Sequence, residues 1–203
     1  MAPRLNFQAV ILGAGSSSRM GCPKQLLEVD GITMLDRTIS AVLQAGLTRP
    51  VLVLGAHRSK ILQSAALASC CRIIVNEQYE TGQASSLIAG VNGLHSSCDA
   101  AIFLLCDQPL LTGGLIGELV AEFDRIRPDI LYPLFRKQRG NPVILAKSTF
   151  PRLLQARGDR GARFLFNAPD LTIHPCEVDD EAVIIDVDTP EEYRALVNSR
   201  TIV

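Results

Sequence analysis

The chain has 203 residues, of which 47% are hydrophobic and 20% charged, and its 20 Lys and Arg residues nearly balance 21 Asp and Glu residues, for a formal net charge of -1. This apolar content supports a sizeable buried core, which excludes a disordered chain or a coiled coil. The balanced charge gives no electrostatic footprint for a nucleic-acid backbone or an anionic membrane, so neither is expected as a partner.

No linker, repeat or low-complexity stretch divides the chain, and we expect one domain over residues 1–203. The N-terminal residues lack the apolar core of a signal peptide, and no apolar run approaches the roughly 20 residues that cross a bilayer. We therefore expect a cytoplasmic protein. The six cysteines form no Cys-x-x-Cys pair and have no histidine at zinc-finger spacing, which favours reduced, structural thiols.

Short apolar runs rich in β-branched residues alternate with segments of helical periodicity, a pattern typical of βα units on a mainly parallel sheet. The predicted strands, in chain order, are residues 8–12, 51–54, 72–75, 100–105, 130–132, 143–145 and 183–186. Apolar spacing predicts helices from Met34 to a stop at Gly46 and over 115–126, and Thr189 and Pro190 begin a last helix. Ligands of such folds bind beyond the carboxyl ends of the strands.

The loop after the first predicted strand, residues 12–24, contains three glycines and two cations. Glycine permits positive φ and lets backbone N–H groups approach an oxyanion, while Arg19 and Lys24 bring positive charge to the same loop. The loop therefore predicts a phosphate cradle.

Three other interpretations of this loop are weaker. A Walker loop needs Gly-Lys-Ser/Thr, whereas Cys22 and Pro23 separate Gly21 from Lys24. The dinucleotide fingerprint needs a third glycine where this chain has Ser18. A glycine turn with solvated cations remains the alternative, and it loses ground because both cations and Pro23 fall within one short loop.

Several motifs follow one another in a recognisable order. The loop reads Leu12-Gly13-Ala14-Gly15, Arg19-Met20-Gly21 and Pro23-Lys24-Gln25-Leu26-Leu27, and the later motifs are residues 82–90, Asp107-Gln108-Pro109-Leu110, Arg139-Gly140-Asn141-Pro142-Val143, residues 158–163 and residues 186–191. With this order and spacing, nearly the whole chain resembles the molybdenum cofactor nucleotidyltransferases, namely the molybdopterin cytidylyltransferases and the related guanylyltransferases. Gly13 replaces the usual first alanine.

The resemblance implies a three-layer α/β/α sandwich with a mainly parallel, Rossmann-like sheet of the nucleotide-diphospho-sugar transferase type. It also implies a metal site. Asp107 follows the predicted strand 100–105, and the resemblance makes it a ligand of Mg²⁺, an ion that typically takes one or two carboxylates plus substrate phosphates. Capping of a turn is the alternative. The second metal carboxylate lies in the Asp186-Val187-Asp188 motif, where alignment on Thr-Pro favours Asp188 over Asp186.

Arg19 and Lys24 are suited to neutralise a triphosphate and the departing pyrophosphate, so the predicted catalytic residues are Lys24, Arg19 and Asp107. The resemblance places the nucleotide on Leu12, Gly13, Ala14, Gly15, Arg19, Lys24, Gly82 and Ser86. A helix start with hydroxyl caps is the alternative at residues 82–86. The guanylyltransferases carry glycine at the position of Ala14, which tilts the prediction toward cytosine.

Two later motifs are candidates for binding the second substrate, molybdopterin. The residues concerned are Arg139, Asn141, Asp159 and Arg163. The arginines can hold anionic groups, and the asparagine can pair with the edge of a heterocycle. An ordinary turn and a solvated loop are the alternatives.

These observations predict a Mg²⁺-dependent nucleotidyltransferase that transfers CMP from CTP to the phosphate of molybdopterin and releases pyrophosphate. GTP as donor, or another small phosphorylated metabolite as acceptor, are alternatives with the same chemistry. A non-catalytic delivery protein that hands molybdopterin to a molybdoenzyme apoprotein is an alternative of another class. Such a carrier does not require Lys24, Asp107 and Asp188 together.

Overall fold

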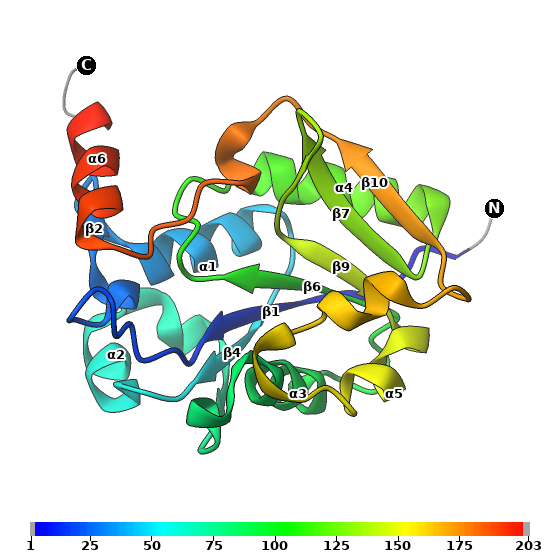
Figure 1. Cartoon of the computed structure of the whole chain (residues 1–203), viewed down its shortest axis with the longest axis horizontal. Helices are drawn as coiled ribbons and strands as arrows, with labels where there is room; N and C mark the ends of the chain where they lie inside the picture. Colours follow the sequence, from blue (N-terminus) through cyan, green and yellow to red (C-terminus); the bar gives the residue numbers. More distant parts are fainter. Residues whose placement is uncertain (1–2, 201–203) are drawn as a thin grey trace.

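A computed structural model describes residues 3–200, and its central feature is a mixed sheet in the order β10-β7-β9-β6-β1-β4-β5 (Figure 1). The strands of this sheet are β1 (Phe7–Gly13), β4 (Val51–Leu54), β5 (Arg72–Val75), β6 (Ala100–Leu105), β7 (Ile130–Phe135), β9 (Val143–Ala146) and β10 (Ile173–Glu177). Among these seven strands, pairing is parallel except at β9, which runs antiparallel to both β6 and β7. A short strand, β8 (Gln138–Arg139), pairs with β7, and β2 (Glu28–Val29) and β3 (Ile32–Thr33) form a separate hairpin.

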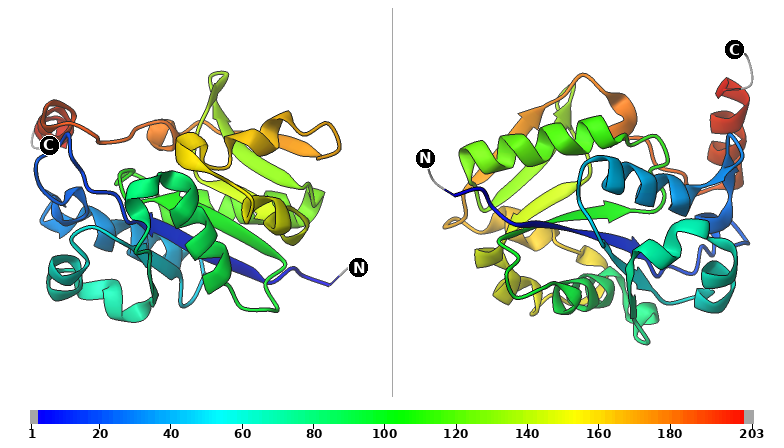
Figure 2. Two further views of the ribbon diagram at one scale, coloured as in Figure 1. Left: turned by 60° about the horizontal axis from the view of Figure 1, so that its bottom comes forward. Right: turned by 180° about the vertical axis from the view of Figure 1, so that it is seen from behind.

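Helices cover both faces of the sheet. The helices are α1 (Met34–Gln44), α2 (Arg58–Ser64), α3 (Gln83–Gly93), α4 (Gly113–Ile126), α5 (Phe150–Leu153) and α6 (Pro190–Arg200), of which α6 lies apart from the sheet, beside β2 (Figure 1). Helices α1 and α4 lie on one face, and α3 and α5 lie on the other (Figures 1 and 2). Within residues 3–200, none of the helices has the length and the apolar content that crossing a bilayer requires.

The alternation of side chains along β1 explains why helices are needed on both faces. Ala9 and Ile11 belong to the core cluster shared with α1 and α4, whereas Val10 belongs to the cluster shared with α3. All three side chains are at most 1% exposed. A strand that is apolar on both faces must be covered on both, as in parallel α/β sheets. The three-layer α/β/α architecture predicted from the sequence is confirmed.

Most predicted elements are confirmed, and one strand is wrong. Residues 183–186 form no strand: Glu181–Val183 is a short 3-10 helix, η7, where Asp180 Oδ1 accepts a hydrogen bond from Ala182 N at 2.9 Å. Its apolar residues are buried in the core without joining a ladder. The sequence did not reveal the two-residue strands β2, β3 and β8 or the longer β10. Strand β10 contains Pro175 and lies at the edge of the sheet, where a missing N–H is tolerated.

Helix α3 lies directly against β1 because Gly90 has no side chain. A Cβ atom at Gly90 would lie 2.5 Å from Val10 Cγ1, which is a buried, branched side chain with no room to move. Gly117, in the interior of α4, is the opposite case, since a Cβ atom there would have no neighbour within 4 Å.

We predict opposite effects of alanine at these two helical glycines. Gly90→Ala should lower the free energy of unfolding by about 1–3 kcal/mol through overpacking, despite its gain in helix propensity. Gly117→Ala should raise the free energy of unfolding by about 0.5–1 kcal/mol. Urea unfolding monitored by circular dichroism measures both. Stabilisation by Gly90→Ala would contradict the close packing of α3 on the sheet.

Candidate active site

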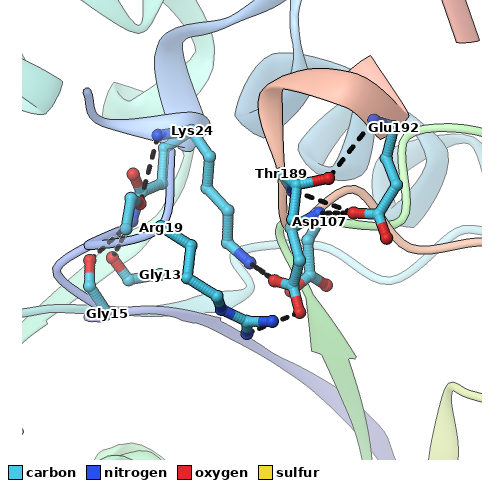
Figure 3. Close-up of polar contacts among 10 residues, drawn as sticks. Gly13, Gly15, Arg19, Lys24, Asp107, Thr189 and Glu192 are labelled. Carbon is cyan, nitrogen blue, oxygen red and sulfur yellow. Dashed lines mark hydrogen bonds and ion pairs between the residues drawn. The ribbon is translucent and has the colours of Figure 1, made fainter. Parts of the chain in front are cut away.

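Three charged side chains from distant parts of the chain meet over the carboxyl end of the sheet (Figure 3). Lys24 Nζ lies 2.5 Å from Asp107 Oδ2 and 2.8 Å from Asp188 Oδ1. Arg19 Nη2 lies 2.7 Å from Asp188 Oδ2. The Lys24 and Asp107 side chains are each 15% exposed and that of Asp188 is 27% exposed, whereas Arg19 extends into solvent. The lysine therefore bridges two carboxylates in a largely buried position.

Backbone and apolar contacts bring these segments together. Asp107 follows β6, and its carbonyl oxygen accepts a hydrogen bond from Val187 N at 2.9 Å. Val187 is buried in one apolar cluster with Met20 of the loop after β1 (residues 12–24, the glycine loop), so this loop and the Asp188 segment share a small core. Gln108 Nε2 adds a bond to Val183 O at 3.2 Å.

The start of α6 fixes the backbone at Asp188. Glu192 Oε2 accepts hydrogen bonds from Asp188 N and Thr189 N, both at 2.8 Å, and Thr189 Oγ1 accepts one from Glu192 N at 3.3 Å (Figure 3). This is a capping box, in which side chains satisfy the free N–H groups of a helix start. The predicted N-cap role of Thr189 is confirmed.

The cluster shifts the pKa values of its members. Burial lowers the pKa of Lys24, but attraction by Asp107 and hydrogen bonds to both carboxylates raise it by more, to a net value above the ordinary one. Burial raises the pKa of Asp188, but the hydrogen bond from Lys24 and the charges of Lys24 and Arg19 give a net lowering. The pKa of Asp186 is raised by burial and by the carboxylates of Asp107 and Asp188. Lys24 contacts Asp188 and not Asp186.

The donor set fits a divalent cation such as Mg²⁺. Asp107 Oδ1 is buried and has no hydrogen-bond partner among residues 3–200, and the opposite oxygen, Oδ2, already faces a cation, the Lys24 ammonium. Within the described part of the chain, no three His, Cys, Asp or Glu side chains gather into a metal-binding group. Two carboxylates suffice for Mg²⁺ when substrate phosphates complete its shell.

A cavity of about 410 Å³ adjoins the cluster. Of the residues predicted to bind the nucleotide, metal or second substrate, those on its wall are Leu12, Gly13, Ala14, Gly15, Lys24, Gly82, Ser86, Asp107 and Asp159. Arg19 does not line it and reaches the cluster through Asp188. Gly82 has φ +111°, and a Cβ atom there would lie 2.6 Å from Gly158 C, so this wall of the cavity requires glycine.

A smaller cavity of about 200 Å³ contains the other predicted acceptor residues, Arg139, Asn141 and Arg163, and it shares Leu12 with the first. The Arg139 guanidinium lies 3.9 Å from the ring centroid of Phe166 and 4.8 Å from that of Tyr132.

The structure separates Asp159 from the other predicted acceptor residues. Asp159 lines the larger cavity only, and its Oδ1 accepts a hydrogen bond from Gln83 N at 3.4 Å, at the start of α3. A further cavity of about 580 Å³, between α1 and residues 109–112, contains none of the predicted site residues.

Two buried amide side chains at or next to the larger cavity were not among the predicted site residues. Gln25 lines the cavity and is 1% exposed. Asn76, 6% exposed, follows β5, and its Nδ2 donates to Ser85 Oγ at 2.8 Å and Ser86 Oγ at 3.1 Å. The signal for Asn76 was available, since a polar residue directly after a strand of such a sheet lies at the ligand edge. Gln25 left no comparable signal.

Comparison with known proteins gives consistent findings over most of the chain. A family model described as the MobA-like NTP transferase domain matches residues 9–173. A nicotine blue oxidoreductase from Paenarthrobacter nicotinovorans is 31% identical over 195 residues, which cover 92% of this chain and 95% of that protein. The molybdenum cofactor cytidylyltransferase of Escherichia coli is 27% identical over 188 residues, which cover 92% and 93%.

A solved structure extends this similarity to three dimensions. Rv0371c from Mycobacterium tuberculosis H37Rv has a TM-score of 0.87 at 27% identity, covering 97% of this chain and 100% of that one. The same protein in complex with manganese has a TM-score of 0.82 at 26% identity, covering 95% and 98%.

We predict that the lysine bridge stabilises the fold in a pH-dependent way. Because the pKa of Asp188 is lowered in the folded state, its contribution is present above the ordinary Asp pKa and is lost as the pH falls through the lowered value. Lys24→Met should therefore lower the free energy of unfolding by about 2 kcal/mol at pH 7 and by less near pH 3, below the ordinary Asp pKa. Urea unfolding at both pH values measures this difference. An equal loss at both would show that Lys24 stabilises only by packing.

Proposed function

The chain belongs to the MobA-like NTP transferase family, and on that premise we propose that it transfers CMP from CTP to the terminal phosphate of molybdopterin and releases pyrophosphate. The observation that carries the proposal is the meeting of Lys24 with Asp107 and Asp188 beside the glycine loop. The 27% identity to the molybdenum cofactor cytidylyltransferase of E. coli supports the choice of reaction.

The triphosphate binds in the larger cavity. The glycine loop offers backbone N–H groups to the phosphate oxygens, and Lys24 and Arg19 supply positive charge. Asp107 and Asp188 are the residues that would hold Mg²⁺, which when bound supplies positive charge to the phosphate oxygens. Gly82 and Ser86 are the contacts of base and ribose at the start of α3.

Molybdopterin is the occupant of the smaller cavity. Arg139, held between two aromatic rings, and Arg163 attract anionic groups of the acceptor, and Asn141 pairs with an edge of the heterocycle. Because the two cavities adjoin, the acceptor phosphate reaches the α-phosphorus without a covalent enzyme intermediate. Its oxygen forms a bond to that phosphorus as the bond to the β-phosphate oxygen breaks, and the electron pair leaves with pyrophosphate. Lys24 stabilises the charge that develops there.

The charged cluster also separates this proposal from a carrier role. A protein that only binds and delivers molybdopterin does not need a largely buried lysine between two carboxylates. The Lys24 ammonium is suited to the charge changes of phosphoryl chemistry, which favours turnover over storage. GTP as donor changes the base but keeps this chemistry.

We predict that the cluster is required for turnover. With CTP, molybdopterin and Mg²⁺, Lys24→Met, Asp107→Asn and Asp188→Asn should each slow pyrophosphate release at least about 100-fold. The first removes the cation that stabilises the departing pyrophosphate, and the other two each remove a carboxylate that would hold Mg²⁺. Asp186→Asn is the matched control, since Lys24 does not contact this carboxylate, and it should keep most of the activity. Full activity of the Lys24 and Asp107 variants, or equal loss in the control, would refute the assignment.

The same assay with CTP, GTP, ATP and UTP compared in parallel tests the donor. We expect the highest kcat/KM with CTP. Preference for GTP would establish the guanylyltransferase alternative, and equal rates with all four would contradict base recognition. Tight binding of molybdopterin without turnover of any nucleotide would favour the carrier.

A further inference from the structure

The side chain of Gln25 holds the glycine loop by two of its carbonyl oxygens. Gln25 Nε2 donates to Gly13 O at 2.9 Å and to Gly15 O at 3.2 Å. Both N–H groups of the amide are thereby engaged. Gln25 is 1% exposed, so these bonds lie in a setting where an unbonded carbonyl would be costly.

Other groups hold the remaining carbonyl oxygens of the loop. The contacts are Ala56 N to Ala14 O at 3.1 Å, His57 Nε2 with Ser16 O at 3.3 Å, and Met20 N and Gly21 N to Ser17 O at 3.0 and 3.1 Å. From residue 13 to residue 17, every carbonyl of the loop therefore has a partner.

The N–H groups of the loop are in the opposite situation. Within residues 3–200, the backbone N–H groups of residues 15–19 donate to no protein acceptor. In a trans peptide the carbonyl and the following N–H point in opposite directions, so a bond that fixes one carbonyl also fixes the next N–H. Gln25 thus orients the N–H groups of Ala14 and Ser16, both of which line the larger cavity. Consecutive N–H groups without internal partners are the donors that bind phosphate oxygens.

Gln25 is also linked to the catalytic cation. It is the next residue after Lys24 in a short 3-10 helix, Lys24–Leu26, and Lys24 N donates to Ser17 Oγ at 3.2 Å. A shift of this turn would move the lysine and the cradle together. The contacts of Gln25 therefore tie the geometry of the N–H groups to the position of the ammonium.

We infer that Gln25 is a positioning residue that preorganises the glycine loop for a triphosphate. The inference rests on the proposed function and deepens it, because it assigns the polyphosphate part of the donor to the loop that Gln25 orders. Gln25 acts through the loop, because its amide N–H groups are engaged by two loop carbonyl oxygens. Its loss raises the KM for the nucleoside triphosphate and leaves the KM for the acceptor unchanged, since the acceptor cavity lacks Gln25.

Calorimetric titration with inorganic tripolyphosphate tests this role without turnover. Gln25→Met keeps the length of the side chain and removes both donors, and Gln25→Glu keeps its shape and removes both donors. Each should weaken tripolyphosphate binding about tenfold. The control is Thr149→Val, which removes the bond of an equally buried hydroxyl to Ala146 O, far from the loop, and should keep the wild-type affinity.

Wild-type affinity in a folded Gln25→Met variant, or the same weakening in Thr149→Val, would overturn the inference. If neither Gln25 variant folds, the amide NMR resonances of residues 15–19 are followed in the wild-type protein during titration with tripolyphosphate. The inference requires that these resonances shift. Resonances that do not shift would show that the loop does not bind the phosphate chain. The two proposals fail separately. If tripolyphosphate binding depends on Gln25 but CTP is not turned over, only the proposed reaction is refuted. If CTP is turned over and its KM is unchanged in Gln25→Met, only the positioning role is refuted.

Discussion

Two ionised carboxylates repel each other in a largely buried site unless a cation lies between them, and in this protein that cation is the Lys24 ammonium. Its partners, Asp107 and Asp188, are 83 and 164 residues further along the chain. The contacts around these residues hold the three side chains together. Val187 binds the carbonyl of Asp107 and shares a small core with Met20, and a capping box fixes the backbone at Asp188. The site is thus one electrostatic unit assembled from three segments.

The charge balance of this unit governs what it can bind. Lys24 and Arg19 already face Asp107 and Asp188, so under the proposed function a metal and a triphosphate would have to exchange partners with these four groups. A phosphate chain would pair with the two cations, and a divalent cation would pair with the two carboxylates. Either ligand alone would leave the charges of one of these pairs without partners. One relative is named for an oxidoreductase activity and another for cytidylyl transfer, over the same extent of the fold. The scaffold therefore does not decide the reaction, and the argument depends on the side chains of the site.

The sequence predicts the central sheet well because its inner strands are continuous apolar runs, as at 51–54 and 100–105. Residues 183–186 carry the same apolar signal, but there it comes from burial of a loop, which local pattern does not distinguish from a strand. In the site, Lys24 and Asp107 follow from the convergence of strand ends. Asp186 and Asp188 share one face of an extended segment, so only the resemblance to a family separated them. Gln25 escaped prediction because its partners are backbone carbonyls, which leave no trace in the sequence.

The central claim of the proposed function is that the Lys24 ammonium lies between the two carboxylates that would hold a divalent metal ion. Titration of Mn²⁺ into the nucleotide-free protein tests this most directly. The account predicts that Lys24→Met binds Mn²⁺ at least about tenfold more tightly than the wild-type protein, because the carboxylates lose their internal cation, and that adding Asp188→Asn removes the gain. Equal or weaker Mn²⁺ binding by Lys24→Met would contradict it.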